Sequence, residues 1–450
     1  MARAKKEAAL TPEERLQAAL VPDWEWPYKL PGNWCWTKIT VITDILNGFA
    51  FKSQHYSSAG IRIIRITNVQ DGFIQDKKPV YYPLESQKEI TPFMLKDGDF
   101  LMSLTGNVGR VAIIDASFLP AALNQRVACL RIKSEDSVRK EYIFYFCLQK
   151  QFVSDCIKSA KGSAQLNMST EWLKEYPIPL PPLAEQQRIV DRIESLFAKL
   201  DEAKEKAQAV VDSFETRKAA ILHKAFAGEL TAKWREEHGV GMESWEKYKF
   251  NELGTLERGR SKHRPRNDPK LFGGKYPFIQ TGDVARSGMY ITEHTQTLSE
   301  VGAEQSKLFP KGTLCITIAA NIGDVSILTY DCCFPDSVVG FTPNERTLSE
   351  YIYYLMSTLQ REIEANAPAT AQKNINLRIL NDLLLDIPSV AEQTQIVNQV
   401  EYLFFQEQHA KEAAEIVLDQ IELMKKSILA RAFRGELGTN DPSEESAVEL

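Results

Sequence analysis

The chain of 450 residues lacks the marks of several protein classes. It has no apolar run close to the roughly 18 residues of a membrane-spanning helix, and no signal peptide opens it. Its seven cysteines form no CxxC pair, and Cys332 and Cys333 are adjacent, which indicates neither a disulfide framework nor a zinc site. We therefore expect a soluble cytoplasmic protein with reduced thiols and no bound metal.

Signatures of catalysis are also missing. We find no GxxxxGK[ST] phosphate loop, no HExxH metal motif, no Asn-Pro-Pro-aromatic motif of amino-group methylation, and no convincing acid and lysine cluster of a metal nuclease. The six histidines are scattered, and a single histidine such as His223 is more often a surface residue than a general base. The sequence therefore predicts no catalytic residue and no cofactor bound by this chain.

The most informative feature that is present is an internal repeat. Residues 184–230 and 391–437 align without a gap at a constant offset of 207. An Ala-Glu-Gln triplet at 184–186 returns at 391–393, and a Gly-Glu-Leu triplet at 228–230 returns at 435–437. Such a repeat predicts two similar surfaces related by an approximate twofold axis.

Each repeated segment predicts one long helix with an apolar stripe of coiled-coil spacing. The stripe steps by four and three residues, and nine of its ten positions are apolar in each copy. In the second copy these positions are Ile396, Val400, Leu403, Glu407, Ala410, Ala414, Val417, Ile421, Met424 and Ile428. About 45 residues make a rod of roughly 65 Å. The simplest cover for such a stripe is the other copy, lying antiparallel in the same chain.

Two charges interrupt these stripes, Arg217 in the first copy and Glu407 in the second. In an antiparallel pair a positions meet d positions, and Arg217 falls at d when Glu407 falls at a. One hypothesis is a partly buried ion pair that sets the register of the helices without necessarily adding net stability. The alternative is that each side chain extends past its neighbours into solvent.

Two blocks of single-domain size accompany the helices. Short apolar runs predict strands at 61–66, 100–104, 111–114, 127–132, 314–318, 325–328 and 338–341, and one helix in each block at 142–152 and 351–363. We divide the chain into an N-terminal arm 1–28, a first block 29–182, a central helix 183–230, a connector 231–244, a second block 245–389, a C-terminal helix 390–437 and an acidic tail 438–450.

The two blocks correspond loosely to each other. Ile64-Arg65 and Asn68-Val69 match Ile279-Gln280 and Asp283-Val284, and Asn107-Val108-Gly109 matches Asn321-Ile322-Gly323. The scaffold positions agree while many polar residues differ. This pattern indicates a common frame that carries two different recognition surfaces.

The net charge of −6 is unevenly distributed. The first block carries +5 and the second −1, so the acid lies mainly in the helices, connectors and tails. Residues 258–275 hold seven basic side chains and one acidic side chain in a turn-rich stretch, which suits phosphate binding. The alternative is a solvated basic loop. The acidic face of the central helix is a candidate partner surface, and the alternative there is a solvated helix face.

Three stretches resemble the specificity subunit of type I restriction-modification enzymes. They are PLPPLAEQ at 179–186, AFAGELTAKWR at 225–235 and SILARAFRGEL at 427–437. The resemblance covers nearly the whole chain. It implies an α+β fold in which two similar α/β target-recognition domains are separated by two long antiparallel coiled-coil helices. The second Gly-Glu-Leu lacks the TAKWR continuation, and we expect the N-terminal arm, with a helix start at 11–14, to fill its role.

The resemblance also implies a function. Such a subunit is not catalytic: it binds an asymmetric bipartite DNA site, each domain reads one half, and the helix pair sets the spacer. Two methyltransferase subunits use S-adenosylmethionine to methylate adenine at N6, and two motor-nuclease subunits use ATP and Mg²⁺ to cut unmethylated DNA. One copy per complex is expected. The rival interpretations are a stand-alone DNA-modifying enzyme, a structural coiled-coil adaptor, and a system that methylates without restricting.

Residues that read bases should be polar and lie on loops at strand ends, since Arg, Asn and Gln make paired hydrogen bonds to bases. In the first block we predict Arg65, Thr67, Asn68, Gln70, Ser103, Thr105, Asn107, Arg110, Asn124, Gln125, Arg126, Lys161, Ser163 and Gln165. In the second block we predict Lys262, Arg264, Arg266, Gln280, Thr281, Asp283, Thr317, Asn321, Asp336, Ser337, Thr370, Gln372 and Lys373. The alternative for Asn107 and Asn321 is a local turn, and for Gln165 and Gln372 a brace within the scaffold.

Overall fold

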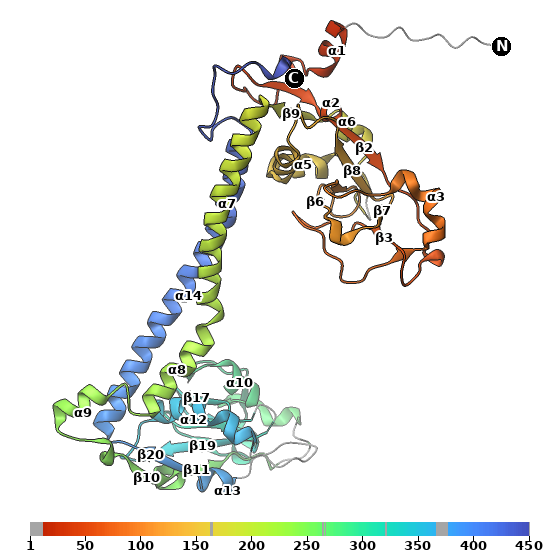
Figure 1. Ribbon diagram of the computed structural model, residues 1–450. Coiled ribbons are helices and arrows are strands. Elements are labelled where there is room, and N and C mark those ends of the chain that lie inside the picture. Colours follow the sequence, from red (N-terminus) through yellow and green to blue (C-terminus); the bar gives the residue numbers. More distant parts are fainter. Residues whose placement is uncertain are drawn as a thin grey trace. The chain divides into compact units, whose positions relative to one another are not determined.

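The computed structural model describes residues 12–162, 165–262, 265, 267–319, 322–365 and 377–449. It divides into two compact units. The first unit holds Met1–Ala207 with Ile416–Leu450, and the second holds Gln208–Glu415 (Figure 1). Each unit therefore combines one block with parts of both repeated segments. Within the described ranges, every helix is too short or too polar to cross a bilayer.

The first unit contains two small sheets and one strand pair. The order of the antiparallel sheet is β2-β8-β5-β6, and that of the second sheet is β4-β3-β7, with β3 and β7 parallel. The strands are β1 Cys35–Lys38, β2 Thr43–Asn47, β3 Ile61–Ile64, β4 Tyr81–Tyr82, β5 Phe100–Ser103, β6 Val111–Ile113, β7 Ala121–Leu123, β8 Val127–Ile132 and β9 Pro177–Leu180, of which β1 pairs with β9. The α-helices are α1 Pro12–Ala19, α2 Ile39–Ile42, α3 Gln87–Ile90, α4 Lys140–Leu148, α5 Lys150–Ser159, α6 Thr170–Lys174 and the start of α7 Leu183–Asp212.

The second unit repeats this plan. Its sheets have the orders β11-β19-β16-β17-β13 and β14-β12-β18-β15, and β10 pairs with β20. The strands are β10 Glu246–Lys249, β11 Gly254–Arg258, β12 Phe272–Phe278, β13 Tyr290–Ile291, β14 Gln296–Leu298, β15 Leu308–Phe309, β16 Leu314–Thr317, β17 Val325–Leu328, β18 Cys332–Cys333, β19 Val338–Pro343 and β20 Leu384–Ile387. The α-helices are α8 Phe214–Phe226, α9 Ala232–His238, α10 Thr281–Arg286, α11 Glu300–Glu304, α12 Ser349–Ala365, α13 Leu377–Asn381 and the start of α14 Val390–Ala432. The predicted α+β fold with an internal repeat is confirmed.

The predicted strands are confirmed, and each of the seven begins at the expected residue. The single helix expected at 142–152 is wrong, because Gln149 is extended (φ −69°, ψ 145°) and separates α4 from α5. The break has a packing reason. Phe146 and Phe152 would point in different directions from one straight helix. Here both rings are buried in one core, with centroids 5.6 Å apart.

The cysteines are buried in the interiors of the two units. All seven are free thiols. Burial raises the pKa of Cys35 to about 11 and the pKa of Cys156 to about 12. These two thiols therefore stay protonated at neutral pH.

Buried glutamines of the Ala-Glu-Gln triplets attach the long helices to the blocks. Gln186, at the start of α7, accepts a hydrogen bond from the Arg139 N–H at 2.9 Å and donates one to the Ser137 carbonyl at 3.0 Å. Gln393, at the start of α14, accepts from the Leu348 N–H at 3.0 Å. Both side chains are fully buried. The helix starts are thus tied to the starts of α4 and α12 in the same way.

The glutamate of the second triplet is buried in the second unit. Glu392 accepts hydrogen bonds from Arg235 Nη1 at 2.6 Å and Thr231 Oγ1 at 2.7 Å. Arg235 Nη2 also donates to the Gly228 carbonyl at 2.6 Å. The TAKWR stretch of α9 therefore supplies the cation that a buried carboxylate needs.

The glutamate of the first triplet has a different partner set. Glu185 accepts from Thr439 Oγ1 at 2.7 Å and from Arg188 Nε at 3.0 Å, and Arg188 makes two 2.8 Å bonds to Glu444. Burial raises the pKa of Glu185, and the hydrogen bonds from Thr439 and Arg188 oppose that rise. The expectation that the N-terminal arm replaces TAKWR is wrong for this contact. The tail after Leu437 supplies Thr439 directly and Glu444 through Arg188, which itself lies on α7.

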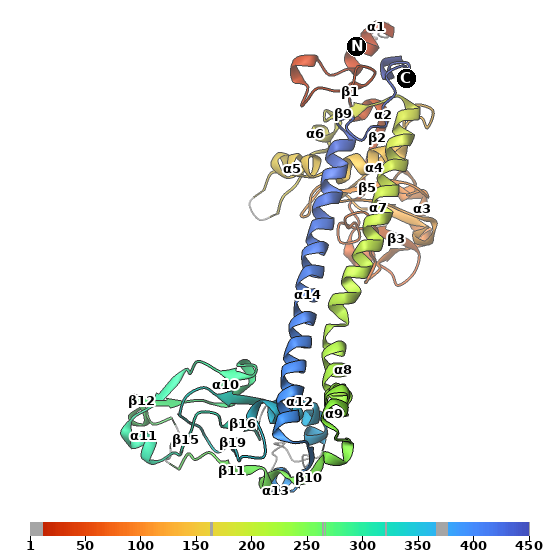
Figure 2. The same cartoon turned by 90° about the vertical axis from the view of Figure 1, so that its left-hand side faces the viewer.

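The two repeated segments lie side by side in each unit (Figures 1 and 2). In the first unit Lys204 Nζ lies 2.6 Å from Glu422, and Lys425 Nζ lies 2.5 Å from Asp201. As residue numbers rise along α7, those of its partners on α14 fall. The helices are therefore antiparallel, as predicted.

Arg217 and Glu407 form an ion pair between α8 and α14 in the second unit, and both side chains are half-buried. Arg217 also donates to Ser213 Oγ and, at 3.1 Å, to the Val210 carbonyl. Ser213 separates α7 from α8, where one continuous helix was expected. Its hydroxyl bonds back to the Ala209 carbonyl, an interaction that often bends helices. Control of the helix register by the ion pair stays a prediction.

The expected apolar stripe is only partly correct on α14. Three of its residues are exposed instead: Ala410, Val417 and Met424. The residues one position later are half-buried: Lys411, Leu418 and Lys425. A straight helix with 3.6 residues per turn drifts by about 20° per heptad against a 3.5-residue repeat. This drift brings the next residue into contact at these three positions, while Ala414 and Ile421 of the same stripe stay buried.

Replacing Arg235 with methionine should destabilise the second unit strongly, because Glu392 then stays buried without its cation. Breaking a buried pair in this way costs about 3–5 kcal/mol; the two side chains are 8% and 1% exposed. Denaturant titration would measure the loss in the free energy of unfolding. Lys233→Ala is the control on the same helix, since Lys233 is 86% exposed and should change stability by at most about 0.5 kcal/mol. If both variants lost equally little free energy of unfolding, Arg235 would not be the cation that Glu392 requires.

Reversing one charge of the ion pair between the helices should lower the stability of the protein, and reversing both charges should restore that stability. Glu407→Lys puts two cations together, whereas adding Arg217→Glu rebuilds the pair in the opposite sense. The single variant should lose about 1 kcal/mol or less, because the pair is only half-buried. Thermal melts of the two variants would test this. A double variant no more stable than Glu407→Lys would remove the register hypothesis.

Candidate nucleic-acid interface

Equivalent backbone hydrogen bonds shape three loops at strand ends in both blocks. In the first block they run from Asn68 N to Arg65 O at 2.8 Å, Ser103 N to Arg110 O at 2.8 Å and Leu104 N to Arg126 O at 2.9 Å. In the second block they run from Asp283 N to Gln280 O at 3.0 Å, Thr317 N to Asp324 O at 2.9 Å and Ile318 N to Ser337 O at 3.0 Å. Positions 65 and 280, 110 and 324, and 126 and 337 are therefore equivalent.

The Asn-x-Gly repeat forms a tight turn in the first block, and its glycine has an equivalent in the second. Gly109 and Gly323 have φ of +82° and +83°, and their N–H groups donate to Ser103 and Thr317 carbonyls at 2.9 Å. A Cβ atom on Gly109 would lie 3.0 Å from Cys156 Cβ. Both the backbone conformation and the close approach therefore require glycine.

Several predicted base-reading residues lie inside the blocks. Five of them are at most 8% exposed: Asn68, Ser103, Thr105, Asp283 and Thr317. Asn68 accepts from the Arg65 N–H at 2.9 Å and donates to the Gln75 carbonyl at 3.0 Å. Thr105 donates to Asn167 at 2.9 Å. We correct the prediction for these five, because their polar groups are buried within the protein scaffold.

The other predicted residues of the first block gather on adjoining loops. Six are exposed: Thr67, Asn107, Gln125, Arg126, Lys161 and Gln165. Four are half-buried: Arg65, Gln70, Arg110 and Asn124. Arg110 Nη1 donates to Gln70 at 2.8 Å, and the Gly106 N–H donates to the Leu166 carbonyl at 2.9 Å. The loops that follow β3, β5 and α5 therefore meet. Ser163 lies outside the described residues.

Fewer predicted residues of the second block can be placed. Lys262 and Gln280 are exposed, and Thr281, Asp336 and Ser337 are half-buried. The remaining six lie outside the described residues: Arg264, Arg266, Asn321, Thr370, Gln372 and Lys373. Within the part of the chain that the structure describes, no three His, Cys, Asp or Glu side chains are grouped so as to hold a metal ion.

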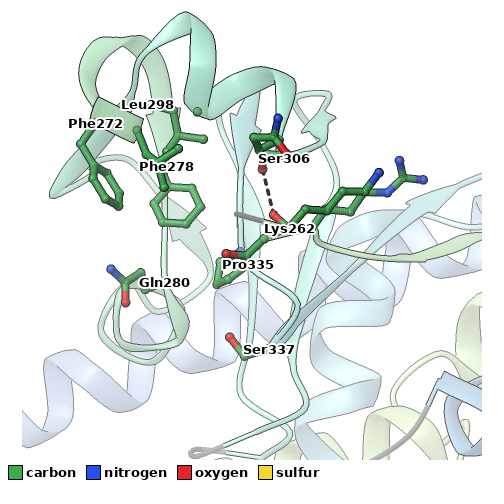
Figure 3. A pocket seen from close by; sticks show the side chains of 13 residues that line it. Lys262, Phe272, Phe278, Gln280, Leu298, Ser306, Pro335 and Ser337 are labelled. Atoms are coloured by element: carbon green, nitrogen blue, oxygen red, sulfur yellow. Dashed lines mark hydrogen bonds between the residues drawn. The ribbon is translucent and has the colours of Figure 1, made fainter. Parts of the chain in front are cut away.

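Three of the predicted residues of the second block line one hollow of about 190 Å³, although they are far apart in the sequence. They are Lys262, Gln280 and Ser337 (Figure 3). Phe272 and Phe278 of β12 form an aromatic wall of the same hollow. Sequence reasoning missed both rings, because it predicted no strand here and assigned Phe272 to the turn-rich basic stretch at 258–275.

Part of the positive charge at 258–275 is balanced within the block. Lys270 Nζ lies 3.2 Å from Asp268, and Lys275 Nζ lies 2.9 Å from Glu300. The hydrogen bond to Glu300 raises the pKa of Lys275. The charge available for phosphates is therefore smaller than the sequence suggests.

Comparisons with known proteins agree with this architecture. The family described as "Type I restriction modification DNA specificity domain" matches residues 31–211 and 242–416. The EcoBI specificity subunit of Escherichia coli is 25% identical over 436 residues, with 89% of this chain and 86% of the relative covered. The EcoKI specificity subunit of E. coli strain K12 is 24% identical, with 91% and 90% covered. The crystal structure of the HsdS subunit from Thermoanaerobacter tengcongensis has a TM-score of 0.64 at 19% identity, with 92% of this chain and all of that chain covered, and thus shares the fold.

Asn68→Ala should weaken the fold of the first block rather than its contacts with a ligand. The change leaves the Arg65 N–H and the Gln75 carbonyl without partners, at a cost of about 1–3 kcal/mol. Chemical denaturation would measure it against Thr67→Ala, an exposed neighbour whose loss should be within about 0.5 kcal/mol. A fully stable Asn68→Ala protein with weakened DNA binding would return Asn68 to the contact set.

Proposed function

Since the chain belongs to the type I restriction modification DNA specificity family, we propose that it reads an asymmetric DNA site in two halves. DNA sequence recognition is the role that the family name itself states. Residues 29–182, recognition domain 1, would read one half-site, and residues 245–389, recognition domain 2, the other. The chain would guide other subunits to that site and carry out no chemistry itself.

The observation that carries this proposal is one backbone frame with two different surfaces. Equivalent loop positions present arginine in recognition domain 1, at Arg65 and Arg126, and Gln280 and Ser337 in recognition domain 2. These side chains prefer different base edges in the major groove. A protein that bound DNA without regard to sequence would have no need of such a difference.

The antiparallel helix pair is proposed to set the number of unread base pairs between the half-sites. Interlocked contacts support this role, since a ruler must resist sliding. Lys204 with Glu422 and Lys425 with Asp201 hold the helices in the first unit, and Arg217 with Glu407 holds them in the second.

The proposed partners are double-stranded DNA, two methyltransferase subunits and two motor-nuclease subunits, with one copy of this chain per complex. S-adenosylmethionine, ATP and Mg²⁺ would be bound by those partners. Large apolar side chains on α14 are exposed and support a protein partner. They are Tyr402 and Phe405 in the second unit and Ile416 and Leu423 in the first, each between 58% and 64% exposed.

Methylome sequencing tests the proposal directly. Cells that express the chain with its methyltransferase subunit should gain N6-methyladenine at one split motif with a constant gap, and cells without the chain should not. Exchanging residues 245–389 for those of a relative should change one half of the motif only. If soluble, assembled protein yields no new motif, the result favours the interpretation as a structural coiled-coil adaptor instead.

A further inference from the structure

The backbone at positions 65 and 280 is held by the same kind of hydrogen bond in the two recognition domains. The Arg65 N–H donates to Asn68 Oδ1 at 2.9 Å, and the Gln280 N–H donates to Asp283 Oδ2 at 2.8 Å. Asn68 and Asp283 are both buried. A polar side chain three residues later thus anchors the backbone in each case, while the anchored residue itself differs. Such a position can change its side chain without changing its loop.

Gln280 is exposed, and a neighbour orients it. Its Nε2 donates to Gln296 Oε1 at 2.8 Å. Gln296 lies on β14 opposite Phe278 of β12, two residues before Gln280. Orienting the amide in advance lowers the entropy lost when it binds a ligand.

The hollow beside Gln280 combines apolar and polar walls. Phe272, Phe278 and Leu298 line one part of it, and Ser337 faces them from the loop before β19 (Figure 3). Lys262 lies at the hollow as well, where a cation suits the DNA backbone. An amide next to an aromatic wall offers two different contacts to a single base pair.

Arg65 has a different environment in recognition domain 1. It is half-buried, and among the described residues its guanidinium makes one hydrogen bond, from Nη2 to the Lys78 carbonyl at 2.9 Å. That bond orients the planar group and leaves further N–H donors. The side chain therefore presents donors only, whereas Gln280 presents a donor and an acceptor.

We propose that 65 and 280 are matched specificity positions: Gln280 reads an A·T pair in one half-site, with the thymine methyl in the Phe272 and Phe278 hollow, and Arg65 reads a guanine in the other. This inference rests on the proposed function. It adds the base class that each recognition domain requires at one position.

The chemistry of the base edges favours these assignments. Adenine shows an acceptor at N7 and a donor at its amino group, which an amide satisfies together. Guanine shows two acceptors, N7 and O6, so the Gln280 oxygen would meet an acceptor, whereas arginine donates to both. The phenylalanine wall gains contact from a thymine methyl and offers nothing to a cytosine amino group. Replacing the A·T pair by G·C should weaken binding of the wild-type complex about 5- to 150-fold.

A reciprocal exchange tests the proposal in the complete complex. Methylome sequencing first gives the wild-type motif. Gln280→Arg should then change one A·T position to G·C in one half-site, and Arg65→Gln should change one G·C position to A·T in the other half-site. Each unaltered half serves as an internal control. Gln305→Arg places the same charge at another point of the hollow and should leave the motif unchanged.

Base analogues test the methyl contact separately. Deoxyuridine in place of the assigned thymine removes one methyl group, which should reduce binding of the wild-type complex about fourfold. With Phe272→Ala, which removes the less buried ring of the wall, the same replacement should have little effect. Deoxyuridine in the half-site of recognition domain 1 is the control.

The outcomes separate the two proposals. Absence of any split motif with the wild-type complex overturns the proposed function. A split motif that stays the same with an active Gln280→Arg complex overturns the inference alone. If that variant does not assemble, Gln280→Ala takes its place, because an exposed residue can be shortened without loss of the fold. Gln280→Ala should then accept any base at that position, and an unchanged motif would again overturn the inference.

Discussion

A buried carboxylate in the first turn of a long helix is the constraint around which each unit is organised. Glu392 is 1% exposed and Glu185 is fully buried, so each requires hydrogen-bond donors and a cation nearby. In the second unit α9 meets this need with Arg235. In the first unit Arg188 does so, joined to Glu444 of the tail. The glutamine that follows each glutamate ties the same helix turn to its block, so the helix start, the block and the returning chain become one structure.

Recognition is possible because structure and surface are carried by different residues. Backbone hydrogen bonds and buried side chains such as Asn68 and Asp283 define the loops. The side chains at the equivalent positions are exposed, as for Arg126 and Gln280, or half-buried, as for Arg65 and Ser337. Because the buried residues rather than these side chains hold the loops, the side chains can differ between the domains. Two surfaces of different chemistry can therefore rest on one architecture, which is what the proposed reading of an asymmetric site requires.

In the helix pair, too, the residues that make the contacts differ from those that the heptad pattern indicates. Its antiparallel contacts combine apolar packing with ion pairs, and at three stripe positions of α14 the residue one position later is in contact, whereas Ala414 and Ile421 stay buried. As a result Lys425 reaches Asp201, and Val417 and Met424 stay at the surface. A helix that were strictly supercoiled would bury those apolar residues and expose the lysine instead.

The sequence by itself determined the repeat, the long helices, the strand starts and the match of Arg65 with Gln280. The repeat and the helices follow from periodicity and from identities at a constant spacing, and the match of Arg65 with Gln280 follows from similar neighbouring residues in the two blocks, none of which needs knowledge of long-range contacts. Tertiary structure alone decided that Asn68 is buried while its neighbour Thr67 is exposed, and that Thr439 and Glu444, rather than the N-terminal arm, complete the site of Glu185. It also brought Gln296, Phe272 and Ser337 to Gln280. The physical reason is that burial and side-chain partners depend on strand pairing and packing between residues far apart in the chain, which local sequence patterns do not encode.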